Sequence, residues 1–384
     1  MSTSYDEQIH IDSLPIELLS DIFLTLKAIH SSIVCQDRSH CAYTTPYSIT
    51  LSHVSRRWRT IAVNTRRLWT FLYMSHLSHN IEYLDTFLTR SASAPLHIVI
   101  HWYPMEKRYE ESISPEHHPV AMDAGLELDT FFAKLVPHIA RWRILDVFSD
   151  AWYSADIFDT PPELGALDDL NITVPELGSA TWAFQEVSMP NLHSLTLWHT
   201  WGLTPDIMDV FTRKHSTTGK SILEPLHALR TVPLDAECDL EQRQTMYREL
   251  QNIRVLVLNY SPNSLLSDSV SLMHDLMKPT EATPYLPNLT TIVTMLPNWP
   301  LMRELVLARR DAGVPLKKIV CDVGALAEDG EHVRWFPQNL EAFGFTQEAL
   351  GESNLTDWLA LDEAKPGTAT FNDTCARLKC RFVF

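Results

Sequence analysis

The chain has 384 residues, more than one ordinary domain, and its 45% hydrophobic content is enough for a substantial core. A formal net charge of −17 at pH 7 repels phosphate backbones and argues against a nucleic-acid-binding protein; the acidity would suit a basic target or would simply keep the protein soluble. No stretch approaches the length of a membrane span, and the polar, acidic first residues are unlike a signal peptide, which predicts a cytoplasmic or nuclear protein whose six cysteines are free thiols.

The first predicted element is a helix that begins at Leu14-Pro15. Proline suits the first helical turn, because its missing N–H removes no hydrogen bond there. Glu17 lies near the positive N-terminal end of the helix dipole. Apolar residues then recur with the spacing of one helical stripe: Leu18, Leu19, Ile22, Phe23 and Leu26.

A second helical pattern follows at 51–62, with Arg56, Arg57 and Arg59 between its apolar positions. Those apolar positions are Leu51, Val54, Trp58, Ile61 and Ala62. Residues 11–69 hold seven Lys or Arg against four Asp or Glu, so this part of an acidic chain is basic. Two isolated helices of this length are marginal in water. They must therefore pack on each other, on the rest of the chain or on a partner.

Five short motifs occur in a recognisable order. They are Leu14-Pro15, Ile22-Phe23, Val54, Arg57-Trp58-Arg59 and Leu68-Trp69. In this order they resemble an F-box, a small helical docking module, and the resemblance covers residues 11–70. It implies binding to a Skp-type adaptor, which in turn binds a cullin. Carried over by position, the adaptor-binding residues would be Leu14, Pro15, Leu18, Ile22, Leu51, Val54 and Trp58.

The resemblance implies a function without catalysis by this chain. F-box proteins serve as substrate-recognition adaptors of SCF-type (Skp–cullin–F-box) ubiquitin ligases. We therefore expect a protein that is not an enzyme and that recruits a target protein for ubiquitination by proximity. One alternative is an F-box scaffold that acts outside ubiquitination. Another is a helical subdomain whose stripes form only its own core.

Residues 27–46 depart from the family pattern, because they lengthen the link between the first and second helices. Long inserts at this point are familiar in F-box proteins from fungi. A surface extension is also inexpensive, since closure entropy grows only logarithmically with loop length. The long link therefore points to fungal F-box proteins as the most similar group, and it weakens the resemblance only slightly.

The rest of the chain contains an irregular repeat, in which an apolar residue is followed by others at +3 and +5. Eight copies are Trp142-Leu145-Val147, Leu167-Leu170-Ile172, Leu192-Leu195-Leu197, Leu229-Val232-Leu234, Ile253-Leu256-Leu258, Leu289-Ile292-Thr294, Leu316-Ile319-Cys321 and Leu340-Phe343-Phe345. Five of the seven start-to-start gaps fall within the span typical of leucine-rich repeats, and the other two suit repeats with loop insertions. In such repeats the last two positions point inward from a strand, and stacking aligns the strands in a parallel sheet.

Together these patterns predict an α/β chain with an N-terminal helical F-box, followed by an irregular leucine-rich-repeat-like solenoid with parallel strands. The target-binding repeats would span 90–350, with a first strand at 96–100 and outer helices at 126–139 and 204–211. Residues 351–384 would form a C-terminal cap or extension. The competing fold is an ordinary α/β domain with crossover helices. A propeller is disfavoured, because its repeat signatures are missing from the sequence.

Motifs with catalytic or ligand chemistry are weak. Residues 215–221 (HSTTGKS) end like a phosphate-binding loop, but Lys214 occupies a position where that loop needs glycine, so we predict a surface loop. Cys35, His40 and Cys41 form a loose group without the paired knuckles of a zinc site. No nucleophile elbow and no H-E-x-x-H motif occurs. We expect no catalytic residue, no cofactor and no metal.

Two tryptophans are candidate target-binding residues. Trp198 and Trp201 directly follow the strand predicted at 192–197. Loops at strand ends build binding surfaces in stacked repeats, and Trp is a typical interface anchor. The alternative is that both pack as core under the neighbouring repeat.

Overall fold

The structure is a computed structural model that describes residues 11–36, 46–75, 81–102, 130–149, 164–173, 188–198, 212–214, 216, 218–231, 240–258, 267–277, 284–294, 298–322, 330–346 and 355–383. The chain divides into two compact units, Met1–Val99 and Ile100–Phe384. It is a mixed α/β protein with an open sheet of parallel strands, so the predicted α/β class is confirmed.

The first unit begins with helices and ends with strands. Its elements are η1 Ile11–Ser13, α1 Ile16–Gln36, α2 Tyr47–Val54, α3 Arg56–Asn64, η3 Arg66–Trp69, β1 Phe71–Ser75, α4 Ile81–Ser91 and β2 Leu96–Trp102. The helix predicted at 51–62 is divided at Ser55, whose hydroxyl caps α3 by accepting from the Trp58 N–H at 3.1 Å. The strand predicted at 96–100 is present as β2.

Trp69 organises the core of the first unit. It is fully buried, and its indole N–H donates to the carbonyl of Ala62 in α3 at 2.8 Å. From α4, Phe87 meets the indole edge-on at 5.1 Å between ring centroids, and the Arg90 guanidinium lies 4.2 Å from the ring centroid. Further buried apolar residues from α1 to η3 are Leu19, Phe23, Leu51, Ile61, Ala62 and Leu68. One indole therefore joins α3, η3 and α4.

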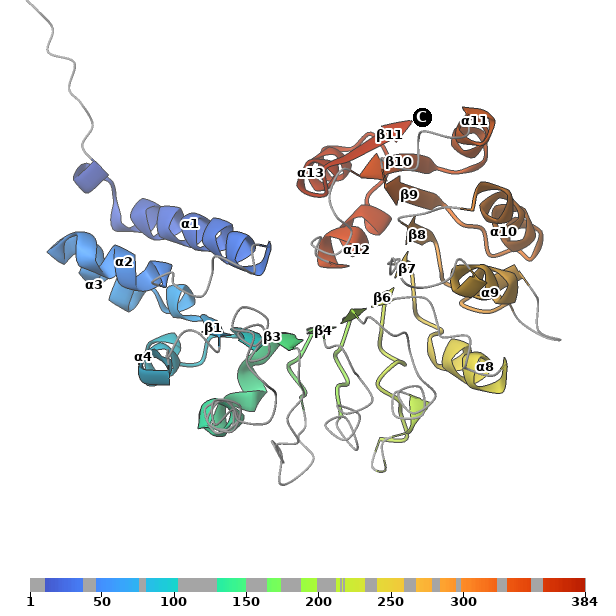
Figure 1. Cartoon of the computed structure of the whole chain (residues 1–384). Helices are drawn as coiled ribbons and strands as arrows, with labels where there is room; N and C mark the ends of the chain where they lie inside the picture. The colour runs from blue at the N-terminus through green and yellow to red at the C-terminus, as the bar shows by residue number, and fades with distance from the viewer. Residues whose placement is uncertain are drawn as a thin grey trace, which may run out of the picture. The chain divides into compact units, whose positions relative to one another are not determined.

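The second unit is a sheet with helices on both faces (Figure 1). Its elements are η4 Val136–Arg141, β3 Trp142–Ser149, β4 Asp169–Thr173, β5 Ser194–Trp198, β6 Ala228–Thr231, α8 Leu240–Glu249, β7 Val255–Leu258, α9 Ser267–Met277, β8 Thr291–Thr294, α10 Trp299–Asp311, β9 Lys318–Asp322, α11 Gly330–Asn339, β10 Ala342–Thr346, α12 Leu355–Glu363, α13 Ala369–Arg377 and β11 Cys380–Val383. From β3 to β10 each strand pairs in parallel with the next, and β11 pairs antiparallel with β10. Of the two predicted outer helices, 126–139 overlaps helical residues 130–135 and the first part of η4, whereas 204–211 lies outside the described residues.

The sheet register aligns the middle positions of the predicted repeats. Consecutive Cα partners are Leu145, Leu170, Leu195, Leu229, Leu256, Ile292, Ile319 and Phe343. Seven copies are thereby confirmed in position. The copy predicted as Leu229-Val232-Leu234 is wrong by three residues, since Leu229 holds the middle position and the triplet is Leu226-Leu229-Thr231. The sequence offered two overlapping frames here, and Leu229-Val232-Leu234 is apolar at all three positions, whereas Leu226-Leu229-Thr231 is not.

The two faces of the second unit's sheet are covered by different parts of the chain. Helices α8 to α11 lie along one face, and α12 and α13 lie on the opposite face, which we call the inner face (Figure 1). A single hydrophobic cluster joins the inner face to these last two helices. It contains Ala228, Val255, Val257, Val293, Val320 and Ala342 from the strands, with Leu355, Trp358, Leu361, Ala364, Phe371 and Leu378 from the C-terminal segment. Residues 355–383 therefore pack as part of the second unit.

Lys318 of β9 fixes the end of α12. Its side chain is buried, and its ammonium donates to the carbonyls of Leu361, Asp362 and Ala364 at 2.5, 2.6 and 2.8 Å. The last carbonyls of a helix have no partner within the helix, so the lysine satisfies them. The Asp362 carboxylate in turn accepts from the hydroxyls of Thr290 and Thr291 at 2.6 and 2.7 Å.

We predict that Lys318→Met detaches the end of α12 from the sheet. The substitution leaves three buried carbonyls without a donor, which costs on the order of 2–4 kcal/mol. The matched control is Lys317→Met, because Lys317 is exposed and its ion pair with Glu341, at 3.6 Å, is also exposed. Urea unfolding and hydrogen exchange of residues 355–364 measure the effect. Equal losses in the two variants would contradict this role of Lys318.

Candidate docking surface

Large apolar side chains remain exposed on the first unit. Across the described residues, those exposed are Ile11, Ile16, Leu18, Ile29, Val54, Val63 and Tyr83. All seven lie between residues 11 and 83, and the described residues of the second unit contribute none, although they are more numerous. An excess of exposed large apolar residues in one unit makes that unit the candidate for an interaction surface. The first unit is therefore the candidate docking module.

Three of the seven predicted adaptor-binding residues lie on this surface. Leu18 of α1 is 51% exposed and Val54, the last residue of α2, is 57% exposed. Pro15, directly before α1, is also exposed. Leu18 is presented because its neighbour Leu19 fills the core, so the two leucines face different sides of α1.

Three further predicted residues, Leu14, Ile22 and Trp58, are half-buried at the margin of the core. The Arg57 guanidinium donates to the Leu14 carbonyl, which attaches the segment before α1 to α3. The Trp58 ring lies 4.8 Å from the Phe23 ring, measured between centroids, and so joins α3 to α1. The structure thus brings the two ends of the predicted motif together.

Leu51 does not lie on the surface. It is only 3% exposed, and Ser48 and Ser52 of the same helix are buried as well. The reason is that α2 turns this side toward α1 and α3, while Val54 faces outward. A helical stripe in the sequence does not tell which of its members face the core and which face a partner. Leu51 therefore supports the surface from beneath and offers no exposed contact.

Sequence reasoning missed five exposed apolar residues. They are Ile11, Ile16, Ile29, Val63 and Tyr83. A signal existed for Ile29, which continues the stripe of Leu18 and Ile22 at helical spacing. It was not used, because residues 27–46 were expected to form only a link between helices.

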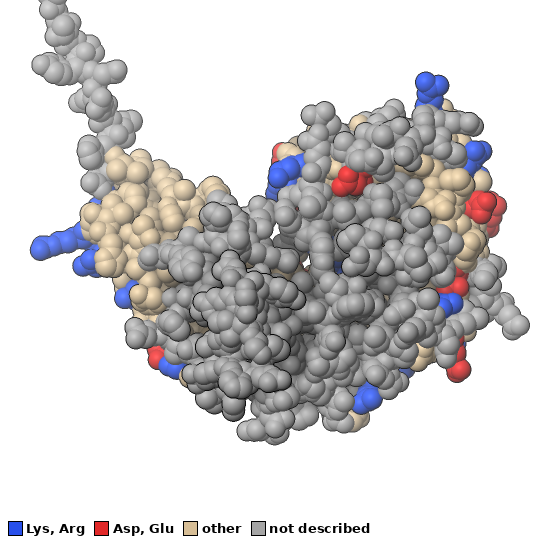
Figure 2. All heavy atoms as spheres, viewed as in Figure 1, with Lys and Arg blue, Asp and Glu red and all other residues tan. Residues whose placement is uncertain are grey.

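Positive charge accompanies the apolar surface. The α3 and η3 elements contain Arg56, Arg59, Arg66 and Arg67 at exposed positions and no acidic residue. Figure 2 shows basic side chains projecting at the left of the view. Charge of this sign favours encounter with an acidic partner more than it adds affinity. The first unit therefore carries a basic α3 and η3, whereas Glu17 and Asp21, which flank Leu18 on α1, are acidic and exposed.

Lys27 attaches the middle of α1 to η3. Its ammonium donates to the Arg67 carbonyl at 2.7 Å and to the Thr70 hydroxyl at 2.6 Å. Burial, together with the nearby charge of Arg67, lowers the pKa of Lys27 to about 8. The folded state therefore binds the Lys27 proton less tightly than the unfolded chain does.

We predict that Lys27 makes the first unit more stable as the pH rises. Below pH 8 the folded unit carries the full cost of burying the charged ammonium. Between pH 8 and 10.5 the folded form releases its proton while the unfolded form keeps it, so the free energy of unfolding rises, by at most about 3 kcal/mol. Urea unfolding at pH 7 and 10, compared with Lys27→Met, isolates this contribution. Parallel changes in the two proteins would contradict it.

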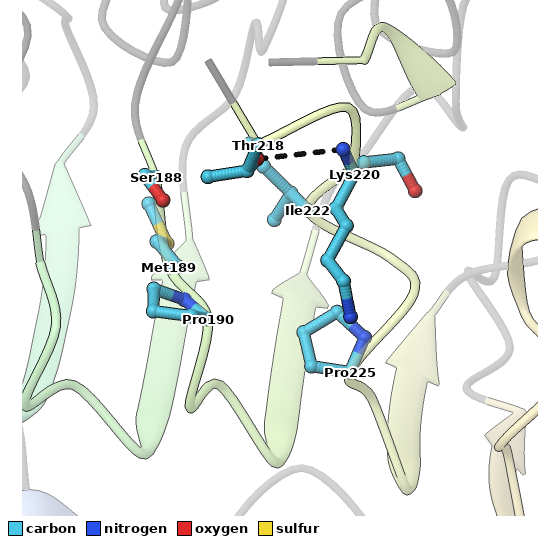
Figure 3. A pocket seen from close by; sticks show the side chains of 8 residues that line it. Ser188, Met189, Pro190, Thr218, Lys220, Ile222 and Pro225 are labelled. Atoms are coloured by element: carbon cyan, nitrogen blue, oxygen red, sulfur yellow. Dashed lines mark hydrogen bonds between the residues drawn. The ribbon is translucent and has the colours of Figure 1, made fainter.

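The loop at 215–221 borders a small cavity of about 50 Å³ (Figure 3). Gly219 adopts a positive φ of 67°, and the Lys220 ammonium forms an ion pair with Glu224 at 3.0 Å. The described residues directly after the loop, up to Ala228, form no helix; the chain turns and enters β6 at Ala228. Nucleotide sites are several-fold larger and place a helix N-terminus at the phosphates. The arrangement agrees with a surface loop.

Several predicted sites fall partly or wholly outside the described side chains. Trp198 is the last residue of β5, but its side chain is outside the described set, and Trp201 lies outside the described residues. The same holds for the Cys35 side chain and for residues 37–45. Within the described residues, no group of three His, Cys, Asp or Glu side chains is placed to hold a metal ion. Nor is any described helix both long and apolar enough to cross a membrane.

Comparison with protein-family models gives no match for this chain, and comparison with curated proteins gives none either. The likeness to an F-box therefore rests on the residues and their arrangement.

Proposed function

We propose that this chain is the substrate-recognition adaptor of an SCF-type ubiquitin ligase. Its first unit, as an F-box, would bind a Skp-type adaptor and, through it, a cullin. Its second unit would hold the target protein. The observation that carries the proposal is the confinement of the exposed large apolar residues to 11–83 of the described chain. In this scheme partner subunits carry out the transfer of ubiquitin, and this chain contributes by holding the target protein close to them.

The arrangement of α1 to α3 supports the docking role. Leu18 and Val54 are exposed at positions where the F-box resemblance requires contacts, and Leu14, Ile22 and Trp58 lie beside them at the edge of the core. Apolar residues that are half-buried become fully buried on binding and contribute at the rate of about 25 cal/mol per Å². Such residues are typical anchors of a docking surface.

The second unit supports a role in target binding, as a leucine-rich-repeat-like solenoid. Its repeats align in register along a parallel sheet, which is the arrangement that stacked repeats produce. The C-terminal helices already occupy the inner face of β6 to β10. On the same face, the positions in register on β4 and β5 are polar: Asp169 and Asn171 are half-buried, and Ser194 and Thr196 are buried. We assign target recognition to the segments that follow these strands, including Trp198 and Trp201.

The charge of the chain suits a basic target. Residues 1–10 carry a net −2 and residues 11–69 a net +3, so 70–384 carry −18 of the total of −17. An acidic body and a basic docking module would favour different partners by long-range attraction.

We predict that a Skp-type adaptor co-purifies with the wild-type chain in a stoichiometric complex. The Leu14→Ala, Pro15→Ala double variant and the Leu18→Asp variant lose the complex, because they remove apolar contacts or place a charge in the interface. Lys317→Asp is the control, since Lys317 is exposed, belongs to the second unit and lies outside the motif. Circular dichroism establishes that each variant is folded. No complex with the wild type would overturn the proposal.

A reconstituted ligase separates this proposal from a scaffold that acts outside ubiquitination. The wild-type chain should bring a cullin into its complex and support ubiquitin transfer to the captured protein. A complex that contains adaptor and cullin, yet leaves every captured protein unmodified, would favour the scaffold.

We predict that the Trp198→Ala, Trp201→Ala variant captures less of the target by at least tenfold while binding the Skp-type adaptor as the wild type does. Loss of two aromatic anchors accounts for a change of this size. Quantitative mass spectrometry of captured proteins, normalised to the adaptor, measures it. Unchanged capture by a folded variant would show that neither tryptophan recognises the target.

A further inference from the structure

The last helix and the last strand of the chain fold back on each other through a tight turn. Helix α13 ends at Arg377, strand β11 begins at Cys380, and the two elements lie side by side (Figure 1). Between them, Lys379 adopts a positive φ of 47°, and its N–H donates to the Ala376 carbonyl at 3.3 Å. This is the arrangement of a Schellman cap. In such caps the side chains at the positions of Cys375 and Cys380 commonly contact each other.

A ring contact shows which sides of α13 and β11 face each other. Phe371 of α13 and Phe382 of β11 lie 4.9 Å apart, measured between ring centroids. Cys375 follows Phe371 by four residues, which is about 6 Å along the same side of the helix. Cys380 precedes Phe382 by two residues, which is about 7 Å along the strand on the same face of the sheet. Because the chain runs in opposite directions through the two elements, these equal steps bring Cys375 opposite Cys380.

The surroundings of the two thiols allow them to pair. Both side chains are half-buried free thiols, and both pack against the hydrophobic cluster of the inner face. Of the three cysteines whose side chains the structure describes, the third is Cys321, which is fully buried. Its Cα partner is Phe345, whereas Cys380 pairs with the next residue, Thr346. Successive side chains of a strand point to opposite faces, so Cys321 lies on the other face of the sheet.

We propose that Cys375 and Cys380 are a redox-sensitive modification site, and that they form a reversible disulfide that fastens α13 to β11. The reaction is exchange with a small disulfide such as oxidised glutathione. The Cys380 sulfur attacks it and releases one glutathione, and the Cys375 sulfur then displaces the second glutathione from the mixed disulfide. Each cysteine proton ends on a released glutathione thiolate, so the protein loses two hydrogens while two glutathione thiols form. The proposal does not depend on the adaptor role.

The order of the two steps follows from the burial of Cys375. Burial raises the pKa of the Cys375 thiol to about 11, although a backbone hydrogen bond and the nearby Lys318 ammonium act in the opposite direction. A thiol with a raised pKa reacts slowly with a reagent in solution. Once glutathione is attached to Cys380, the same thiol reacts within the molecule, where its effective concentration is high. The first attack therefore belongs to Cys380 and the second to Cys375.

The test maps the disulfides of the full chain after incubation with excess oxidised glutathione. Trypsin cuts after Arg377, Lys379 and Arg381, so it separates the two cysteines into different peptides. A disulfide keeps these peptides joined, and mass spectrometry detects one species that dithiothreitol divides. We expect the joined species to contain most of both cysteines. Mixed disulfides with glutathione, or links to other cysteines, in place of the joined species would overturn the proposal.

A shifted cysteine is the control for geometry. In the Cys375→Ser, Ala376→Cys variant the thiol moves by one residue to an exposed position, about 100° around the helix and away from β11. The joined species should form at least about tenfold more slowly than in the wild type, because the two thiols no longer face each other. Equal rates would show that closeness along the chain is sufficient, and would contradict the assigned pairing.

Hydrogen exchange measures the effect of the disulfide on the C-terminal segment. Helix α13 belongs to the cover of the inner face, so a link to β11 limits its separation from the sheet. Oxidation should slow amide exchange of residues 369–378 about fivefold in the wild type and leave it unchanged in Cys380→Ser. Equal exchange in the oxidised and reduced wild type would show that the disulfide does not fasten the helix.

Discussion

The stability of the second unit depends on burying the apolar side chains on both faces of its sheet. A strand cannot bury its own side chains, so other parts of the chain must cover each face. Each strand offers one short row to each face of the sheet, and the parallel register places like positions side by side from Leu145 to Phe343. The helices α8 to α11 cover one face, and the C-terminal segment covers much of the other (Figure 1). Parallel strands buried on both faces are expected to be largely apolar on both. The covered inner face follows this rule except at buried polar residues such as Thr291 and Lys318, which bond to the C-terminal segment. Where the polar positions of β4 and β5 begin, the cluster that joins the sheet to α12 ends.

The first unit, by contrast, leaves large apolar side chains exposed to water. Ring contacts contribute to its core: Phe23 packs against Trp58, and Phe87 packs against Trp69. Polar bonds from Lys27, Arg57 and Ser55 hold the short helices where they are. None of these bonds involves the side chain of an exposed apolar residue, so those side chains are available for a partner.

Much of the fold was predictable from the spacing of apolar residues, because that spacing is set by the geometry of strands and helices. Seven repeat copies fell in the observed register, and the failure at Leu229 came from a second apolar triplet, Leu229-Val232-Leu234, that overlaps the observed one. The surface was harder to predict. Leu18 and Leu51 are equally apolar members of amphipathic stripes, yet one is exposed and the other is buried. Only the packing of α1, α2 and α3 on one another decides between them.

The division of the inner face was not visible in the sequence either. The role of Lys318 depends on a contact with residues 43 to 46 positions later in the chain, and no local pattern announces it. In the sequence, Lys317 and Lys318 look like two neighbouring lysines that are both exposed to solvent. Its burial follows from the carbonyls that end α12, which come into reach only after the chain has folded back.

Lys317 and Lys318 are neighbours in the chain, yet their amines differ in chemical reactivity. The Lys317 side chain is exposed, whereas the Lys318 amine is enclosed by three carbonyl oxygens. An acylating reagent will therefore modify the first and spare the second for as long as α12 stays seated. Peptide mapping around this pair would read the state of the C-terminal segment directly, with the adjacent lysine as an internal standard.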